Sequence, residues 1–166
     1  MALPAAVTSS LIGANFNATS TTALFALRTK AFGTEGTEWL YVHSNTAHTT
    51  GQLLAVNSVG TGQNCTTVFA CSGISTQGAD FGFVPSVAWT AGDYGWICTR
   101  GLAYVQCSGT TVPNTALHTA NTPGAIHTTS SSGSLVGIEL VVSASTASLV
   151  VTTAILTWPR SIILLG

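Results

Sequence analysis

Alternating apolar and polar positions predict a series of short strands. The run LFALRTKAFGTEGTEWLYVHS (residues 24–44) contains two β-prone segments around Gly33-Thr34-Glu35-Gly36, a sequence typical of a hairpin turn. QLLAVNSVGTGQN (residues 52–64) predicts a strand ending at a glycine-rich turn, Gly60–Gly62, and CTTVFACSG (residues 65–73) predicts a further short strand. Helical periodicity is weak throughout, so the pattern indicates a β protein.

The clearest hairpin lies between residues 82 and 109. Its predicted turn is Ala91-Gly92-Asp93-Tyr94-Gly95, where glycine allows positive φ and Asp93 can accept a local backbone hydrogen bond. Beyond the turn the side chains alternate between two faces: Cys98, Arg100, Leu102, Tyr104 and Gln106 on one, and Ile97, Thr99, Ala103, Val105 and Cys107 on the other. Gly101 interrupts the second face and predicts a bulge or a close backbone approach.

The C-terminal part predicts a loop-rich stretch followed by two long strands. Residues 108–134 are rich in Thr, Ser, Asn and Pro and predict loops with one short strand. SLVGIELVVSAS (residues 134–145) is nearly continuously apolar, so we expect burial on both faces, and ASLVVTTAILTWP (residues 147–159) predicts its neighbour. Turns recurring about every 8–12 residues predict an all-β fold, a compact β-sandwich or β-barrel.

The first 22 residues have neither helical nor strand periodicity. They are small and polar, with scattered apolar anchors at Leu3, Pro4, Leu11, Ile12 and Phe16. We therefore predict an extended N-terminal arm over residues 1–22, followed by a single domain over residues 23–166 with a short C-terminal tail. Twenty extended residues span up to ~66–72 Å, so such an arm would reach well beyond the domain.

Composition narrows the function classes. The chain has 166 residues and 16.9 kDa, a one-domain length, with 46% hydrophobic residues and a net charge of −1. Only 5% of residues are charged, against about 25% in an ordinary soluble domain.

We expect no nucleic-acid partner, because no basic cluster would neutralise phosphates. We expect no membrane partner either, because a spanning helix needs ~20 consecutive apolar residues. The best apolar stretch, residues 155–165, is shorter and is interrupted by Thr157, Pro159, Arg160 and Ser161. Few charges and a mean hydropathy of +0.47 favour permanent docking in an assembly.

The titratable residues form no recognisable catalytic or metal-binding pattern. Glu35, Glu38 and Asp93 lie at predicted turns, and His118 and His127 are further apart than the usual pairs of zinc ligands. Nucleophile-elbow, P-loop and dinucleotide motifs are missing from the sequence. We predict no enzyme activity, metal or cofactor. A hydrolase that uses Asp80 and Glu139 is the enzymatic alternative.

Cysteine and tryptophan leave two questions open. Cys65, Cys71, Cys98 and Cys107 lack C-x-x-C spacing and are predicted to be buried thiols, with a Cys65–Cys71 bridge as the alternative. Trp39 and Trp96 lie in predicted strands and are expected to pack in the core. Trp89 precedes the Asp93 turn and Trp158 precedes Pro-Arg, so these two leave a glycan-binding surface as an alternative.

Three segments carry a resemblance to a known family. Phe25–Val42 follows the pattern F-x-L-x-T-x-x-x-G-x-x-G-x-E-(W/Y)-x-Y-V, Ala91–Trp96 reads AGDYGW, and Leu156–Ser161 ends in W-P-R-S. In these segments the chain resembles the small decoration, or cement, proteins of tailed-bacteriophage heads. The resemblance implies a β-barrel or sandwich, commonly trimeric, that caps contacts between major capsid proteins without catalysis.

These observations predict a virion structural protein. Its expected partners are the major capsid protein and two further copies of itself, and its expected location is the outer capsid surface, reached from the host cytoplasm during assembly. The candidate capsid contacts are Leu3, Pro4, Leu11, Ile12, Phe16, Trp158, Arg160 and Ile162. The alternative function is a glycan-binding module or a tail-fibre, receptor-binding domain.

Overall fold

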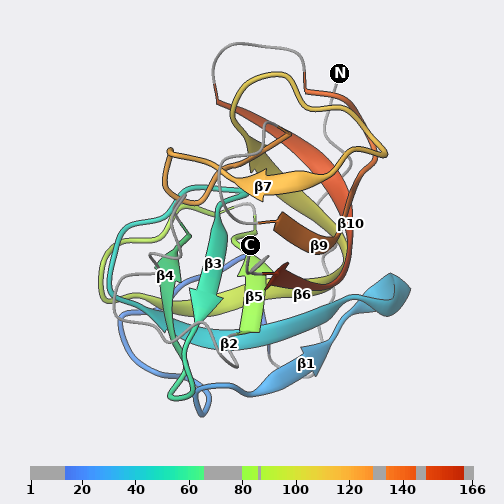
Figure 1. The fold of residues 1–166 in the computed structure, drawn as a ribbon. Helices are drawn as coiled ribbons and strands as arrows, with labels where there is room; N and C mark the ends of the chain where they lie inside the picture. The colour runs from blue at the N-terminus through green and yellow to red at the C-terminus, as the bar shows by residue number, and fades with distance from the viewer. Residues whose placement is uncertain (1–13, 66–79, 86, 129–133, 145–148, 163–166) are drawn as a thin grey trace.

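The protein is nearly all β, which confirms the predicted class (Figure 1). The computed structural model describes residues 14–65, 80–85, 87–128, 134–144 and 149–162. Its elements are β1 (Lys30–Phe32), the 3-10 turn η1 (Thr34–Gly36), β2 (Glu38–Ser44), β3 (Leu53–Val56), β4 (Thr61–Asn64), β5 (Asp80–Phe83), β6 (Tyr94–Cys107), β7 (Leu117–Thr119), β8 (Ile126–His127), β9 (Ser134–Leu140) and β10 (Val150–Ile162).

Five of these strands close into a β-barrel. β2 pairs with β4 in parallel, and antiparallel pairings then run from β4 to β3, β5 and β6 and back to β2. Of the two architectures that the sequence predicts, the barrel is therefore the one formed. β1 adds to the outside of this barrel by pairing with β2.

A second closed circuit of strand pairings lies above the barrel in Figure 1. It runs from β6 to β10, β9, β7 and β8, and a parallel bridge returns from β8 to β6. We call these five strands the second ring. The 14-residue β6 belongs to both circuits, because its first half pairs with β2 and its second half with β10. One long strand thus joins the two parts of the domain.

The barrel interior is narrow and filled by a few apolar side chains. They form a cluster of Leu40, Val42, Leu54, Val56, Val84, Trp89 and Ile97. A Cβ on Gly95 would lie 2.6 Å from Trp89 Cζ2, so glycine is required where the indole crosses the strand. Trp89 is only 2% exposed. The alternative in which Trp89 forms part of a glycan-binding surface is therefore contradicted, because its ring fills the barrel.

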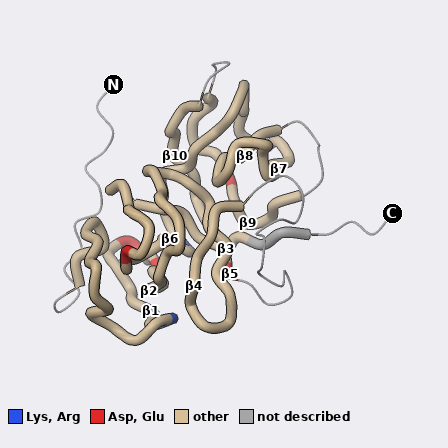
Figure 2. Tube along the Cα trace, turned by 90° about the vertical axis from the view of Figure 1, so that its left-hand side faces the viewer, with Lys and Arg blue, Asp and Glu red and all other residues tan. Residues whose placement is uncertain are grey.

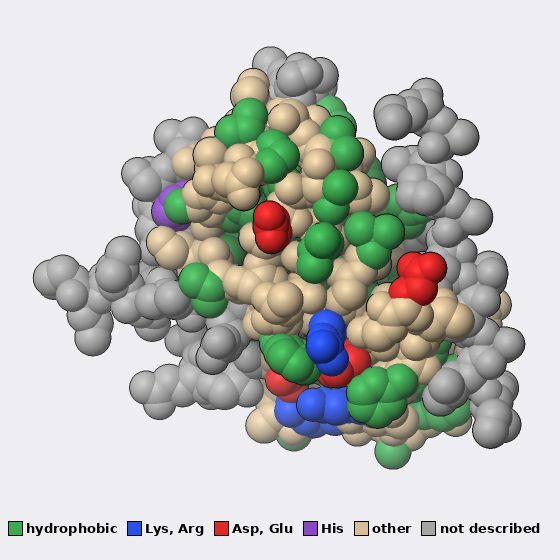
Figure 3. Space-filling view, turned by 90° about the vertical axis from the view of Figure 1, so that its right-hand side faces the viewer, with side chains coloured by type: hydrophobic (Ala, Val, Ile, Leu, Met, Phe, Trp, Pro, Cys, Tyr) green, Lys and Arg blue, Asp and Glu red, His purple; other side chains and the backbone are tan. Residues whose placement is uncertain are grey.

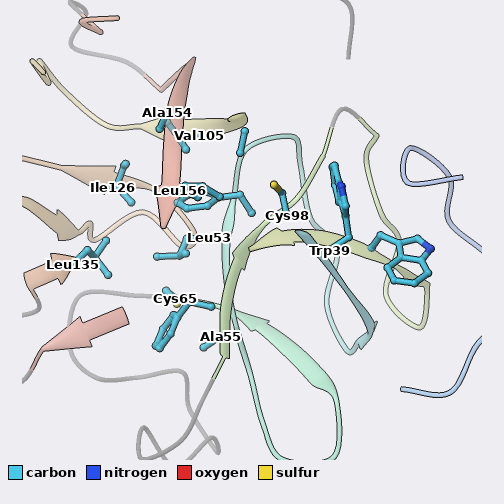
Figure 4. Packing of buried hydrophobic residues seen from close by; sticks show 14 of the residues in the cluster. Trp39, Leu53, Ala55, Cys65, Cys98, Val105, Ile126, Leu135, Ala154 and Leu156 are labelled. Atoms are coloured by element: carbon cyan, nitrogen blue, oxygen red, sulfur yellow. The ribbon is translucent and has the colours of Figure 1, made fainter. Parts of the chain in front are cut away.

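A larger apolar cluster covers the outside of the barrel. On one side Trp39 and Trp96 are covered by Phe16, whose ring stacks on Trp39 at a centroid distance of 4.7 Å. Elsewhere in this cluster, Figure 4 shows Leu53 from the barrel gathered with Leu156 and Ile126 from the second ring. The predicted core positions of Trp39 and Trp96 are confirmed.

The described part of the predicted arm, residues 14–22, lies against the barrel. Ala14 and Phe16 are buried, and Ser20 forms a backbone bridge with Tyr94. Phe16 is therefore a core side chain, which corrects its prediction as a capsid contact, because its 2% exposed surface offers almost nothing to a partner. Leu3, Pro4, Leu11 and Ile12 lie outside the described residues.

Several local predictions are confirmed. η1 joins the antiparallel strands β1 and β2, and Asp93 Oδ2 accepts the Thr90 N–H at 2.7 Å. Gly101 has φ +93°, and a Cβ there would lie 2.7 Å from Thr37 Cγ2, which is the predicted close approach. Cys98 and Cys107 are buried free thiols, as predicted. Residues 66–73 of the strand predicted at 65–73, Cys71 among them, lie outside the described residues.

The prediction that the strand at 134–145 is buried on both faces is wrong. Within β9 only Leu135 and Leu140 are buried, and Glu139 is exposed. Residues 136–138 are half-buried, so most of β9 is only partly covered by neighbouring elements. An apolar run does not reveal this partial exposure, because valine and isoleucine occupy half-exposed strand positions readily.

Candidate functional site

A row of outward-facing residues crosses four strands where the barrel meets the second ring. Phe32 of β1 pairs with Glu38 of β2, Glu38 pairs with Arg100 of β6, and Arg100 pairs with Thr157 of β10. Directly opposed residues in antiparallel strands project to the same side of the sheet. The topology thus brings residues from both ends of the sequence to one surface.

Glu38, Arg100 and Trp158 form an interlocked group on this surface, which we call the Trp158 cluster. The Trp158 indole N–H donates to Glu38 Oε2 at 2.9 Å, and Arg100 Nη1 donates to Glu38 Oε1 at 3.0 Å. The guanidinium carbon of Arg100 lies 4.5 Å from the centroid of the indole ring. Each side chain therefore contacts both of the others, and this restricts their rotamers although Trp158 is 50% exposed.

The Trp158 cluster keeps its carboxylate ionised. The hydrogen bond from the Trp158 indole lowers the pKa of Glu38, and the hydrogen bond and charge of Arg100 lower it further. Both donors favour the charged form because they interact more strongly with a carboxylate than with a carboxylic acid. The group is thus a fixed aromatic and ionic feature at neutral pH.

A backbone irregularity turns Trp158 outward. Between Leu156 and Arg160 the pairing of β10 with β9 shifts, and Trp158 adopts φ +53°, a left-handed conformation that is unusual for tryptophan. Gly137 lies opposite, where a Cβ would be 2.7 Å from the Thr157 carbonyl oxygen. Such a conformation costs about 1–3 kcal/mol. The fold tolerates this cost at a residue whose side chain is displayed on the surface.

Further apolar side chains surround the Trp158 cluster. Leu102 and Ile155 are cross-strand partners with exposed fractions of 37% and 47%, and Phe32 is 58% exposed. We call Phe32, Leu102, Ile155 and Trp158 the apolar face. Figure 3 looks onto the side of the molecule where β10 lies, and shows hydrophobic side chains spread among uncharged polar ones, with most of the charges gathered low on this side. Figure 2 shows how few charges the rest of the described trace carries.

The predicted contacts near the C-terminus have separate outcomes. Trp158 is exposed and lies in the cluster with Arg100 and Glu38, neither of which the sequence indicated as its neighbour. Arg160 and Ile162 belong to β10, but their side chains lie outside the described part of the structure. Glu38 is 120 residues from Trp158, so only the strand pairings reveal the group.

The carboxylates of the enzymatic alternative lie in different parts of the fold. Asp80 is in β5 of the barrel, where Arg28 Nη2 contacts its Oδ2 at 2.5 Å. Glu139 is in β9 of the second ring, opposite Ile155. Asp80 therefore already has a cationic partner, and the strand pairings do not place it next to Glu139.

A buried Ser–His–Asn arrangement escapes sequence analysis. His48 Nε2 contacts Ser44 Oγ, and His48 Nδ1 lies 2.9 Å from Asn64 Oδ1. The Ser44 hydroxyl also donates to the Thr46 carbonyl oxygen at 2.7 Å, so its proton is not directed at the imidazole as in a hydrolase. Ser44 is completely buried and His48 is 2% exposed, so substrate has no access to the hydroxyl. The group ties the loop after β2 to the end of β4.

The described residues contain no group of three His, Cys, Asp or Glu that could hold a metal ion. Burial raises the pKa of the Cys98 thiol to about 12, which keeps it protonated and unreactive at neutral pH. The part of the chain that the structure describes contains no helix with the length and apolar character of a membrane span.

The chain matches no protein-family model, no curated protein and no solved structure. The three sequence segments and the Trp158 cluster are therefore the observations that bear on the function of this chain.

Proposed function

We propose that this chain is a structural protein of a bacteriophage virion that binds the outer capsid surface and cements neighbouring major capsid proteins as a homotrimer. One observation carries the proposal: two of the three segments that resemble decoration proteins, the first and the third, meet at the Trp158 cluster although 120 residues separate Glu38 from Trp158. Glu38 belongs to the first segment, Trp158 belongs to the third, and Arg100 follows the second on β6. Residues of a shared motif that meet at an exposed surface are better explained by recognition than by core packing.

The physical character of the surface supports the same proposal. Tryptophan and arginine are the residues that most often dominate protein–protein binding energies. Here the contacts with Glu38 hold both in place before binding, which reduces the entropy lost on association. Many identical copies on one shell would add the effect of multivalency to modest individual contacts. The protein would reach the shell in the host cytoplasm and remain on the virion.

The copy number of the chain relative to the major capsid protein in purified particles tests this proposal. We expect a ratio of the same order as the capsid protein, and a much lower ratio for Trp158→Ala. Val59→Ala is the control, because Val59 is 65% exposed on the turn between β3 and β4. A few copies per particle for the wild-type chain would instead place it in the tail or a fibre.

Glycan binding is the second candidate, and the exposed indole of Trp158 favours it. Sugars stack on aromatic rings and hydrogen-bond to neighbouring charged groups, and Glu38 and Arg100 lie beside this ring. A glycan array decides between the two functions. Saturable glycan binding that is lost in Trp158→Ala, with few copies per particle, would support the glycan-binding function and contradict the capsid function.

A further inference from the structure

A small open cavity lies between the N-terminal segment and the barrel, on a different set of residues from the apolar face. Its volume is about 90 Å³. Ser20, Leu24 and Phe25 line one side, and Tyr41, Tyr94 and Trp96 of β2 and β6 line the other. Tyr41, Tyr94 and Trp96 are aromatic side chains on the outer face of the barrel, and Phe16 makes an edge-to-face contact with Trp96.

The walls of the cavity are held in place by backbone and ring contacts. The Leu24 N–H donates to Tyr41 Oη at 3.0 Å, and Ser20 and Tyr94 exchange backbone hydrogen bonds of 3.0 and 2.8 Å. Phe25 makes edge-to-face contacts with Tyr41 and Trp96, both at centroid distances of 5.2 Å. The cavity is therefore formed in the free chain and does not require a ligand to order it.

The lining defines the chemistry of a ligand. The exposed lining is more apolar than polar, although Asn15, Thr19 and Ser20 contribute polar groups at one side. No charged side chain lines the cavity, and Leu24 at its edge is 67% exposed. A cavity of about 150 Å³ lined by Leu, Ile and Phe holds benzene, so a cavity of about 90 Å³ suits a group of fewer carbons. A branched aliphatic group of a few carbons fits both the size and the polarity.

We propose that this cavity receives one branched aliphatic side chain, of valine, leucine or isoleucine, from a partner protein. The identity of the partner rests on the proposed function, under which it is the major capsid protein. An exposed leucine beside an unfilled apolar cavity favours insertion of a protein side chain, because the bound segment would also cover Leu24. The cavity would be a second contact, independent of the Trp158 cluster.

Isobutanol, which carries the same branched group, tests the cavity without any capsid. In a two-dimensional NMR titration of the full chain we expect saturable shifts at the amides of Ser20 and Leu24 and at the indole N–H of Trp96. Ala18 is an exposed residue that lines the cavity, so Ala18→Leu should abolish these shifts. Ala116→Leu is the matched control, an exposed alanine next to β7. Shifts that do not saturate, or that persist in Ala18→Leu, would overturn the cavity as a ligand site.

Binding to purified particles that lack this chain tests the partner. We expect Ala18→Leu to bind about ten- to a hundredfold more weakly than wild type, the effect of one lost aliphatic contact, and Ala116→Leu to bind normally. Leu24→Ser is a second variant at a site too exposed to affect folding, and it should also weaken binding. Equal binding by all variants would reject the capsid protein as the occupant. Failure of wild type to bind would reject the proposed function, and the isobutanol titration would still decide whether the cavity takes an aliphatic group.

Discussion

The barrel and the second ring use their strands differently. All four residues of β3 are buried, as are three of the four in β5, because these strands have the barrel interior on one side and the large apolar cluster on the other. β10 instead alternates: Thr152, Ala154 and Leu156 are buried, whereas Ile155 is exposed. The outer side of the second ring has no further layer over it among the described residues.

This difference separates stability from recognition. Substitutions inside the barrel should change the free energy of unfolding, because every side chain there is packed on all sides. Substitutions on the outer side of the second ring should change binding and leave the fold nearly unaffected. β6 belongs to both parts, with Ile97 inside the barrel and Leu102 on the apolar face.

The largest expected effect is that of Trp89→Ala. Removing the side chain that fills the barrel should lower the free energy of unfolding by about 3–5 kcal/mol in urea titrations. Trp89→Phe is the matched control, because the indole Nε1 has no hydrogen-bond partner in the described structure and phenylalanine keeps most of the ring. If Trp158→Ala lowered the free energy of unfolding as much as Trp89→Ala, the assignment of stability to the barrel and of recognition to the second ring would be contradicted.

A smaller loss is expected from Gly95→Ala, about 1–3 kcal/mol by overpacking. The added methyl group would lie 2.6 Å from the Trp89 ring, which has no room to move. Gly62→Ala provides the comparison, because its nearest atom is Leu54 Cδ2 at 3.1 Å, the end of a flexible side chain. In thermal unfolding, the Tm of Gly95→Ala should be lower than that of Gly62→Ala. The reverse order would show that the Trp89 ring does not prevent a side chain from fitting at residue 95.

Acid should weaken the barrel through His48. Burial lowers the pKa of His48 below its usual value of about 6.5, so the unfolded chain binds this proton more readily than the folded one. Above about pH 6.5, His48 should therefore cause no change in the free energy of unfolding with pH. Between this pH and the lower pKa of the folded state, the free energy of unfolding should fall by at most about 1.4 kcal/mol for each unit that the pH decreases. His48→Gln should remove this contribution to the slope in urea titrations at several pH values. An unchanged slope would mean that His48 is not the responsible group.

The smallest expected effect concerns the left-handed conformation of Trp158 in the second ring. Glycine adopts φ +53° without steric cost and alanine does not, so Trp158→Gly should be about 1 kcal/mol more stable than Trp158→Ala. Both variants should lose particle binding equally, because both lack the indole. If alanine were the more stable variant, the backbone at this position would not be strained.

Local sequence predicted the elements that depend on few neighbouring residues. The β1–β2 hairpin, the Asp93 turn and the close approach at Gly101 follow from turn residues and strand propensity. The burial of the strand at 134–145 cannot be predicted in this way, because its apolar residues do not distinguish a covered face from an outward one. The buried position of Phe16 is equally unpredictable, because a lone aromatic residue in a polar segment gives no indication of the Trp39 ring on which it stacks.

The β class, the main turns and the low charge can be read from the sequence, because they are properties of composition and of residues close together in the chain. Long-range strand pairing, in contrast, closes β2 to β6 into a barrel, places Trp89 inside it, and brings Glu38 and Trp158 together across 120 residues. The physical reason is that alternation with a period of two defines two strand faces but not the partners of either. Those partners are selected by long-range pairing and by the packing of the whole domain.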